Sequence, residues 1–113
     1  MYGLPKDFDG TFLVGRILEM VCFSQYQVYL HFDSEITITI ESSISYQNDE
    51  IITIPFHNFN LIELIGKPIS EVSSDDKGTL CLVFKKEKIL KIYDTSKQYE
   101  SYSIANKGKV III

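Results

Sequence analysis

The sequence predicts a mainly β domain with one short helix, in which two pseudo-repeated antiparallel β-meanders form a sandwich or a partly open barrel. Three observations predict it. Segments 27–32 and 36–41 alternate between apolar and polar residues, which is typical of strands with one buried face. Segment 79–84 is apolar at nearly every position. Finally, the stretch LVGRILEMV at 13–21 is similar to the stretch LIGKPISEV at 64–72.

Segments 27–32 and 36–41 predict a hairpin. The polar residues Asp33, Ser34 and Glu35 between them are typical of a tight turn. Pairing Phe32 with Ile36 then places every apolar side chain of both strands on one face, as a half-buried hairpin requires.

Segment 79–84 predicts a strand covered on both faces, because both of its faces carry apolar side chains. The turn sequence DDKG precedes it, and a lysine-rich turn leads from it into a further strand at 89–94. The register that we expect pairs Leu82 with Ile92 and Phe84 with Leu90.

Between these hairpins the sequence predicts the helix. Asn58 or Asn60 can cap it, and a stripe of leucines and isoleucines follows. Gly66 ends it, and Pro68 forbids its continuation. At about two turns it is too short to be stable alone, so we expect it to dock on the sheet.

The echoed stretch predicts two pseudo-repeats within a single domain at 1–113, one at about 12–54 and one at about 61–104. Gly15 matches Gly66 in this alignment. Each copy reads as a glycine with a basic neighbour followed by four strands, and only the second copy has the helix. The last strands matched in this way are 51–54 and 101–104. The alternative is chance likeness, because any two meanders alternate.

Charge is unevenly distributed along a chain with a net charge of −4. Residues 1–56 hold two basic residues against eight acidic ones, whereas residues 57–113 hold nine lysines against seven acids. An acidic half disfavours nucleic acid as a partner and favours a basic protein. The alternative is a solvated surface whose asymmetry carries no function.

Two polar clusters are candidate recognition surfaces, because tyrosine is enriched at interfaces. One lies on the polar face of the first hairpin and the other around the loop at 94–104. The alternative for the second cluster is structural, with its tyrosines packed at the sheet edge and its aspartate capping a turn. The candidate binding residues are Tyr26, Tyr29, His31, Asp94, Tyr99, Glu100 and Tyr102.

The sequence predicts no enzyme, no cofactor and no metal site. His31 and His57 are the only histidines, and no Cys-x-x-Cys spacing or glycine-rich phosphate loop is present. Cys22 and Cys81 sit in apolar runs and are expected to be buried. A hydrolase that uses either histidine with a carboxylate stays an alternative. Four lysines at 85–91 would suit a small anion, or would protect a sheet edge.

The ends of the chain indicate location and assembly. MYGLPKDFDG lacks the basic and apolar regions of a signal peptide, and no apolar run is long enough to span a membrane. We therefore expect a cytoplasmic protein. The final KVIII must add to the sheet or be covered by another chain, which favours a homodimer.

Nearly the whole chain carries a recognisable pattern, in the stretches GLP at 3–5, FLVGRILEMVC at 12–22, QVYLHFD at 27–33, GTLCLVF at 78–84 and YESYSI at 99–104. In this pattern it resembles a family of small bacterial proteins of unknown function. The resemblance brings no catalytic residue with it. It implies a setting like that of the immunity proteins of toxin systems, by analogy of size and charge.

These observations predict a non-enzymatic cytosolic protein-binding module, with a toxin-neutralising immunity protein as its most specific form. The expected partner is a basic protein, such as a toxin, or a second copy of the chain. One alternative is a protein that binds a nucleotide or metabolite. Another is a purely structural, oligomerising domain.

Overall fold

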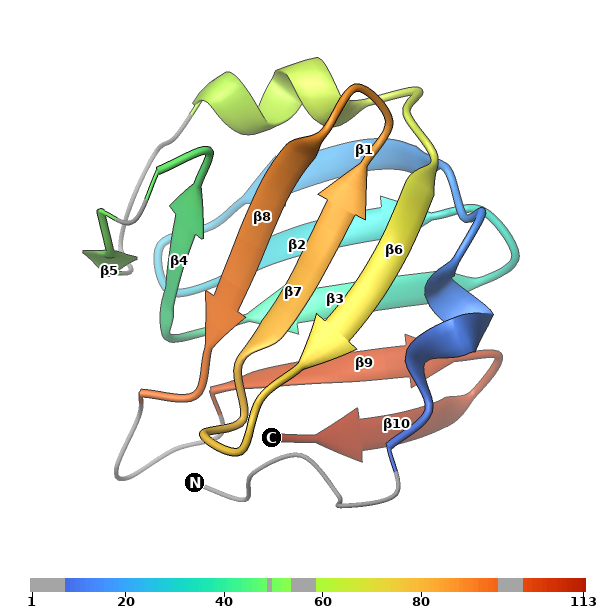
Figure 1. The fold of residues 1–113 in the computed structure, drawn as a ribbon. Helices are drawn as coiled ribbons and strands as arrows, with labels where there is room; N and C mark the ends of the chain where they lie inside the picture. The colour runs from blue at the N-terminus through green and yellow to red at the C-terminus, as the bar shows by residue number, and fades with distance from the viewer. Residues whose placement is uncertain (1–7, 49, 54–58, 96–100) are drawn as a thin grey trace.

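The structure is a computed structural model that describes residues 8–48, 50–53, 59–95 and 101–113. These residues form two antiparallel sheets that pack face to face, and the strands of one sheet cross those of the other at a steep angle (Figure 1). The elements are, in chain order, the 3-10 helix η1 (Gly10–Leu13), the strands β1 (Leu18–Phe23), β2 (Val28–Phe32), β3 (Ile36–Ile40), β4 (Ser43–Tyr46) and β5 (Ile52–Thr53), the 3-10 helix η2 (Phe59–Leu64), and the strands β6 (Ile69–Ser74), β7 (Leu80–Phe84), β8 (Lys88–Tyr93), β9 (Tyr102–Asn106) and β10 (Lys109–Ile112).

The predicted fold class, mainly β with a sandwich architecture, is confirmed. The first sheet has the order β1-β2-β3-β9-β10 and the second has the order β5-β4-β8-β7-β6. Each sheet therefore takes three consecutive strands from one half of the chain and two from the other half. The sequence predicted two separate meanders, and this exchange of strands between them was missed.

The first hairpin has the predicted register. Phe32 lies opposite Ile36 and Leu30 opposite Ile38, and these four side chains are buried. Alternation excludes a shift by one residue, which would turn the apolar face to solvent, and the short polar turn at 33–35 excludes a shift by two.

The register predicted for the second hairpin is wrong by two residues. Leu82 pairs with Leu90 and Phe84 with Lys88. The length of the turn explains the observed register. In both hairpins the last two turn residues have positive φ, at 34 and 35 and again at 86 and 87, so both turns have the same length. A shift by two keeps the apolar faces together, so periodicity alone could not exclude it.

The predicted helix is the 3-10 helix η2, and η1 is a second 3-10 helix that the sequence reading did not predict. Each half of the chain therefore has a short helix, and the prediction that only the second copy has one is wrong. Short pieces are the usual form of 3-10 helix, and each of these ends shortly before a glycine of positive φ. Asp9 caps η1, its carboxylate accepting a hydrogen bond from the Thr11 amide at 3.0 Å.

The two echoed stretches pair with each other. Ile17 and Pro68 form an isolated antiparallel bridge. On one side of it the Gly15 amide donates to the Ile69 carbonyl at 2.8 Å, and on the other the Gly66 amide donates to the Leu18 carbonyl at 2.7 Å. This junction joins the two halves of the chain at the entry to β1 and β6.

Both sheets repeat the same pairing pattern. A register shift interrupts β1 against β2 and, at the matching place, β6 against β7. Ile38 of β3 pairs with Ile104 of β9, just as Leu90 of β8 pairs with Tyr46 of β4. The strand that matches β9 is therefore β4, and the predicted match of 51–54 with 101–104 is wrong. These are matches of position, and duplication of the sequence stays a prediction.

The core lies between the sheets and draws on the inner faces of both. The rings of Phe32 and Phe84 stack with centroids 6.4 Å apart, so the two matched strand ends meet in it. The outer face of β7 is less covered than predicted, since Cys81 is only half-buried. Cys22 is also a half-buried free cysteine, against the prediction of burial.

The C-terminal stretch adds to the sheet, which was one of its two predicted outcomes. It forms β10 beside β9, and the fully buried Ile113 exchanges backbone hydrogen bonds with Tyr102. Among the described residues, no helix is long and apolar enough to cross a membrane.

Candidate functional site

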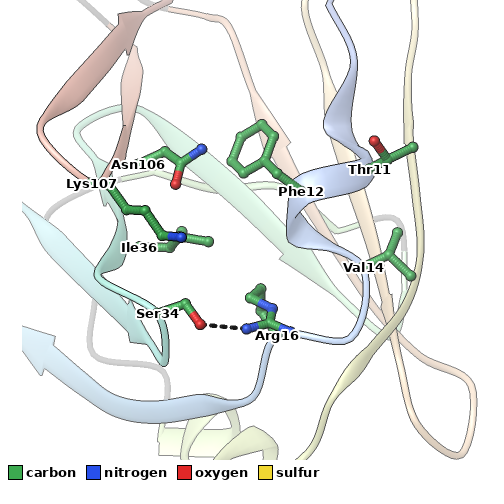
Figure 2. A pocket seen from close by; sticks show the side chains of 8 residues that line it. All are labelled: Thr11, Phe12, Val14, Arg16, Ser34, Ile36, Asn106 and Lys107. Atoms are coloured by element: carbon green, nitrogen blue, oxygen red, sulfur yellow. Dashed lines mark hydrogen bonds between the residues drawn. The ribbon is translucent and has the colours of Figure 1, made fainter.

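A cavity of about 430 Å³ opens between η1 and the nearby end of the first sheet (Figure 2). We call it the Arg16 pocket. Its lining combines two basic side chains, three small polar ones and three apolar ones. They are Thr11, Phe12, Val14, Arg16, Ser34, Ile36, Asn106 and Lys107.

Strand exchange assembles this pocket. Ile36 at the start of β3 pairs with Asn106 at the end of β9, so the turn after β2 and the turn after β9 lie side by side. The Lys107 amide donates to the Glu35 carbonyl at 3.1 Å and ties the two turns together. The segment from η1 to Arg16 closes the third side (Figure 2). Residues from both halves of the chain are therefore needed to form the pocket.

Arg16 is held in place at the edge of the pocket. Its Nη1 lies 3.6 Å from Asp33 Oδ2 and donates a hydrogen bond to the Ser34 hydroxyl. Asp33 is itself fixed, because its Oδ1 accepts from the Ile17 amide at 3.0 Å. Both charged side chains are about one-third exposed, at 31% and 32%. The guanidinium has five N–H donors, so it keeps donors for a further group.

The second cation, Lys107, extends over the pocket beside Ile36 (Figure 2). No acidic side chain in the described part of the chain forms an ion pair with it. Phe12, Val14 and Ile36 add an apolar wall. An apolar wall with two cations beside it is suited to a ligand that joins an apolar body to an anionic group.

The matching place in the second half is occupied by a carboxylate. Glu63 precedes the buried Leu64 as Phe12 precedes the buried Leu13. The Tyr46 hydroxyl donates to Glu63 Oε1, and Lys88 Nζ lies 3.6 Å from the same oxygen. The hydrogen bond from Tyr46, with help from Lys88, lowers the pKa of Glu63, while burial raises the pKa of Tyr46.

The predicted residues of the first hairpin lie together on the outer face of the first sheet. The rings of Tyr29 and His31 stack with centroids 6.1 Å apart. The Tyr29 hydroxyl donates to the Gln27 side chain, whose amide nitrogen donates to Glu41 at 2.6 Å. His31 Nδ1 lies 3.1 Å from the Thr37 hydroxyl. The side chains form a ladder across the strands, and their polar atoms largely satisfy one another.

The other predicted binding residues that the structure describes do not form one site. Tyr26 is 68% exposed in the turn before β2. Asp94 accepts a hydrogen bond from the Ser101 hydroxyl at 2.7 Å. Tyr102 is fully buried, and its hydroxyl donates to the Gly78 carbonyl at 2.7 Å, so it packs in the core and is not available to a partner. Tyr99 and Glu100, and also His57, lie outside the described residues.

The residues of the Arg16 pocket could not be recognised as a group from the sequence. Arg16 stood out only as the basic neighbour of a repeated glycine, and Ser34 only as a turn residue. Lys107 belongs to an Asn-Lys-Gly turn near the end of the chain. Such a sequence predicts a hairpin but does not predict a binding site. Their proximity depends on the pairing of β3 with β9, which no local pattern encodes.

Comparison with known proteins gives one match. Residues 11–113 match a family described as a family of unknown function, DUF6188. No curated protein and no solved structure matches the chain.

Proposed function

The chain belongs to this family of unknown function, and we propose that it is a non-enzymatic binding protein whose Arg16 pocket holds the anionic group of its ligand. The observation that carries the proposal is that Arg16 and Lys107 line one cavity together with the apolar side chains of Phe12, Val14 and Ile36. At about 430 Å³ the cavity lies in the range of small-molecule sites.

Binding without catalysis is supported by the chemistry of the lining. The two hydroxyls there, on Thr11 and Ser34, have no histidine or carboxylate among the lining residues to activate them. Ser34 instead accepts a hydrogen bond from Arg16. Arginine is suited to this role because its charge is permanent and its donors form a rigid fork.

The test is a titration followed by amide chemical shifts in ¹⁵N-labelled protein, with acetate, benzoate, inorganic phosphate and a nucleoside monophosphate as probes. At least one probe is expected to shift the amides of η1 and of the turns at 33–35 and 107–108, and the shifts are expected to vanish in Arg16→Ala. Lys67→Ala is the matched control, because Lys67 follows Gly66 as Arg16 follows Gly15. Absence of shifts with every probe would contradict the proposal.

A second candidate is protein binding in the cytoplasm, with a toxin-neutralising immunity protein as its specific form. Exposed apolar side chains at the junction favour it, since Val14, Ile17, Ile62 and Ile65 are each 40–48% exposed. Co-expression with the product of a neighbouring toxin gene tests it. Formation of a complex that Ile65→Asp abolishes would support it, and survival of the toxin's activity in the presence of the protein would count against it.

Self-association is the other form of protein binding that the structure supports. The edge strand β10 exposes Val110 and Ile112, at 57% and 44%. Sedimentation equilibrium decides between a homodimer and a monomer, and Val110→Lys is expected to weaken a dimer formed through this edge.

A further inference from the structure

Granting that the Arg16 pocket binds an anion as proposed above, we infer that the group it takes is a carboxylate carried on an aromatic or branched aliphatic body. Two features of the pocket lead to this ligand class, its charge balance and its apolar lining, and comparison with the matching place in the second half supports the second of them.

The charge balance fits one negative charge. Arg16 and Lys107 supply two positive charges, and Asp33 at 3.6 Å from Arg16 compensates one of them. A carboxylate carries a single charge at neutral pH, whereas a phosphate monoester carries about −1.5 to −2. A phosphate would therefore meet too little positive charge and would also lie close to the Asp33 carboxylate.

The apolar wall fits the body of the ligand. Phe12 and Val14 belong to the η1 segment and Ile36 to β3 across the cavity from it, with the Arg16 guanidinium at the edge (Figure 2). A ring or branched chain can pack on Phe12 and Ile36 while its carboxylate meets the planar fork of Arg16. A small inorganic anion would leave this wall in water.

The matching place in the second half has a different chemistry. Glu63 stands at the position of Phe12, and its carboxylate is held by Tyr46 and Lys88. The residue at the position of Lys88 in the first half is Ile36, since Lys88 pairs with Phe84 as Ile36 pairs with Phe32. The first half therefore has apolar side chains where the second has its own carboxylate and lysine, so this part of the Arg16 pocket suits the apolar body of a ligand.

The experiment compares three probes that share a benzene ring: phenylacetate, phenyl phosphate and benzyl alcohol, each titrated into the ¹⁵N-labelled full chain. Phenylacetate is expected to bind about tenfold more tightly than benzyl alcohol, because only the acid meets Arg16. Arg16→Ala is expected to remove that advantage, and Lys107→Ala, which changes an exposed side chain, is expected to reduce it. Lys67→Ala should leave it unchanged.

Tighter binding of phenyl phosphate than of phenylacetate, lost in Arg16→Ala, would overturn the carboxylate assignment and leave anion binding intact. No response to any charged probe would overturn both. Arg16→Lys adds a further check, since it keeps the charge and loses the fork, and undiminished phenylacetate binding by it would overturn the role of the guanidinium.

The carboxylate can belong to a free small acid or to the C-terminus of a peptide chain. N-acetyl-Gly-Phe and its C-terminal amide distinguish these sources. Tighter binding of the free peptide acid than of phenylacetate, with no binding of the amide, supports the assignment and makes a chain terminus the source. Weaker binding of the peptide acid supports a free small acid.

Discussion

Ile17 and Pro68 lie opposite each other in the antiparallel bridge that joins the two halves of the chain. Around this pair, Gly15 and Gly66 occupy matching positions, each donating its amide to a carbonyl of the opposite segment. The entry segments of β1 and β6 thus stabilise each other, and the Arg16 pocket opens beside them. We propose that the halves are copies of one unit that exchange their last two strands.

Replacing Gly15 or Gly66 by alanine is expected to destabilise the protein to a similar degree. Their φ angles are +84° and +88°, a region that costs an L-residue about 1–2 kcal/mol. An added Cβ meets no heavy atom within 4 Å at either site, so no clash adds to this cost. Urea denaturation measures the loss, and asparagine at the same positions should cost less. Very different losses at the two glycines would argue against equivalent halves.

Tyr46→Phe is expected to raise the pKa of Glu63 towards its ordinary value of 4.5, because the Tyr46 hydroxyl is the main cause of its lowering. Lys88→Ala should raise the pKa less. A carboxylate with a lowered pKa stabilises the fold above its unfolded pKa, and this stabilisation is lost as the pH falls through the folded value. The pH dependence of unfolding near and below pH 4.5 should therefore flatten in Tyr46→Phe. Carbon-detected titration of Glu63 measures both variants, and a larger change in Lys88→Ala would contradict the assignment.

Asp75→Ala is expected to cost about 1 kcal/mol at neutral pH, as loss of a capping carboxylate does. Asp75 Oδ1 accepts from the amides of Thr79 and Lys77, both at 2.9 Å, and shapes the turn before β7. The hydrogen bond from Thr79, and after it that from Lys77, lowers the pKa of Asp75 below its ordinary value of 3.8. Its contribution is therefore present above the unfolded pKa and disappears as the pH falls below about 3.8.

The control for Asp75 is Asp76→Ala, which removes the same charge one position later. Thermal unfolding of both variants from pH 7 to pH 2.5 gives the comparison. If the two variants lose stability equally, the effect of Asp75 is one of net charge and not of its hydrogen bonds.

Tyr102→Phe is expected to cost about 2 kcal/mol, because it leaves the buried Gly78 carbonyl without its hydroxyl donor. Tyr29→Phe, on the outer face of the first sheet, should change stability by less than about 0.5 kcal/mol. Guanidinium unfolding of the two variants measures this contrast. Equal and small losses would show that the Tyr102 hydroxyl does not act as a structural donor.

The local elements of this protein could be predicted from its sequence. The hairpin of β2 and β3 was predicted with its register, because alternation excluded a shift by one residue and the short turn at 33–35 excluded a shift by two. The second hairpin shows the limit of the same reasoning. Its apolar residues tolerate a shift of two, and the turn conformation at Lys86 and Glu87 decided between the choices.

The candidate site could not be predicted in the same way. Of the residues singled out by type, Tyr29 and His31 stack on a sheet face and bond to neighbouring side chains there, and Tyr102 is buried. Residue type indicates what a side chain can do, but a site also requires partners. Arg16, Ser34 and Lys107 become partners only where three distant segments meet.

The sequence by itself determined most of the strands, their apolar inner faces and the repeated stretch at Gly15 and Gly66, because alternation and turn chemistry act over a few residues. Only the tertiary structure decided that β4 crosses to β8 and β9 to β3, and with this the place of the pocket. Such long-range pairing carries a cost in loop closure that only burial of the whole core offsets, so no short stretch of sequence contains it.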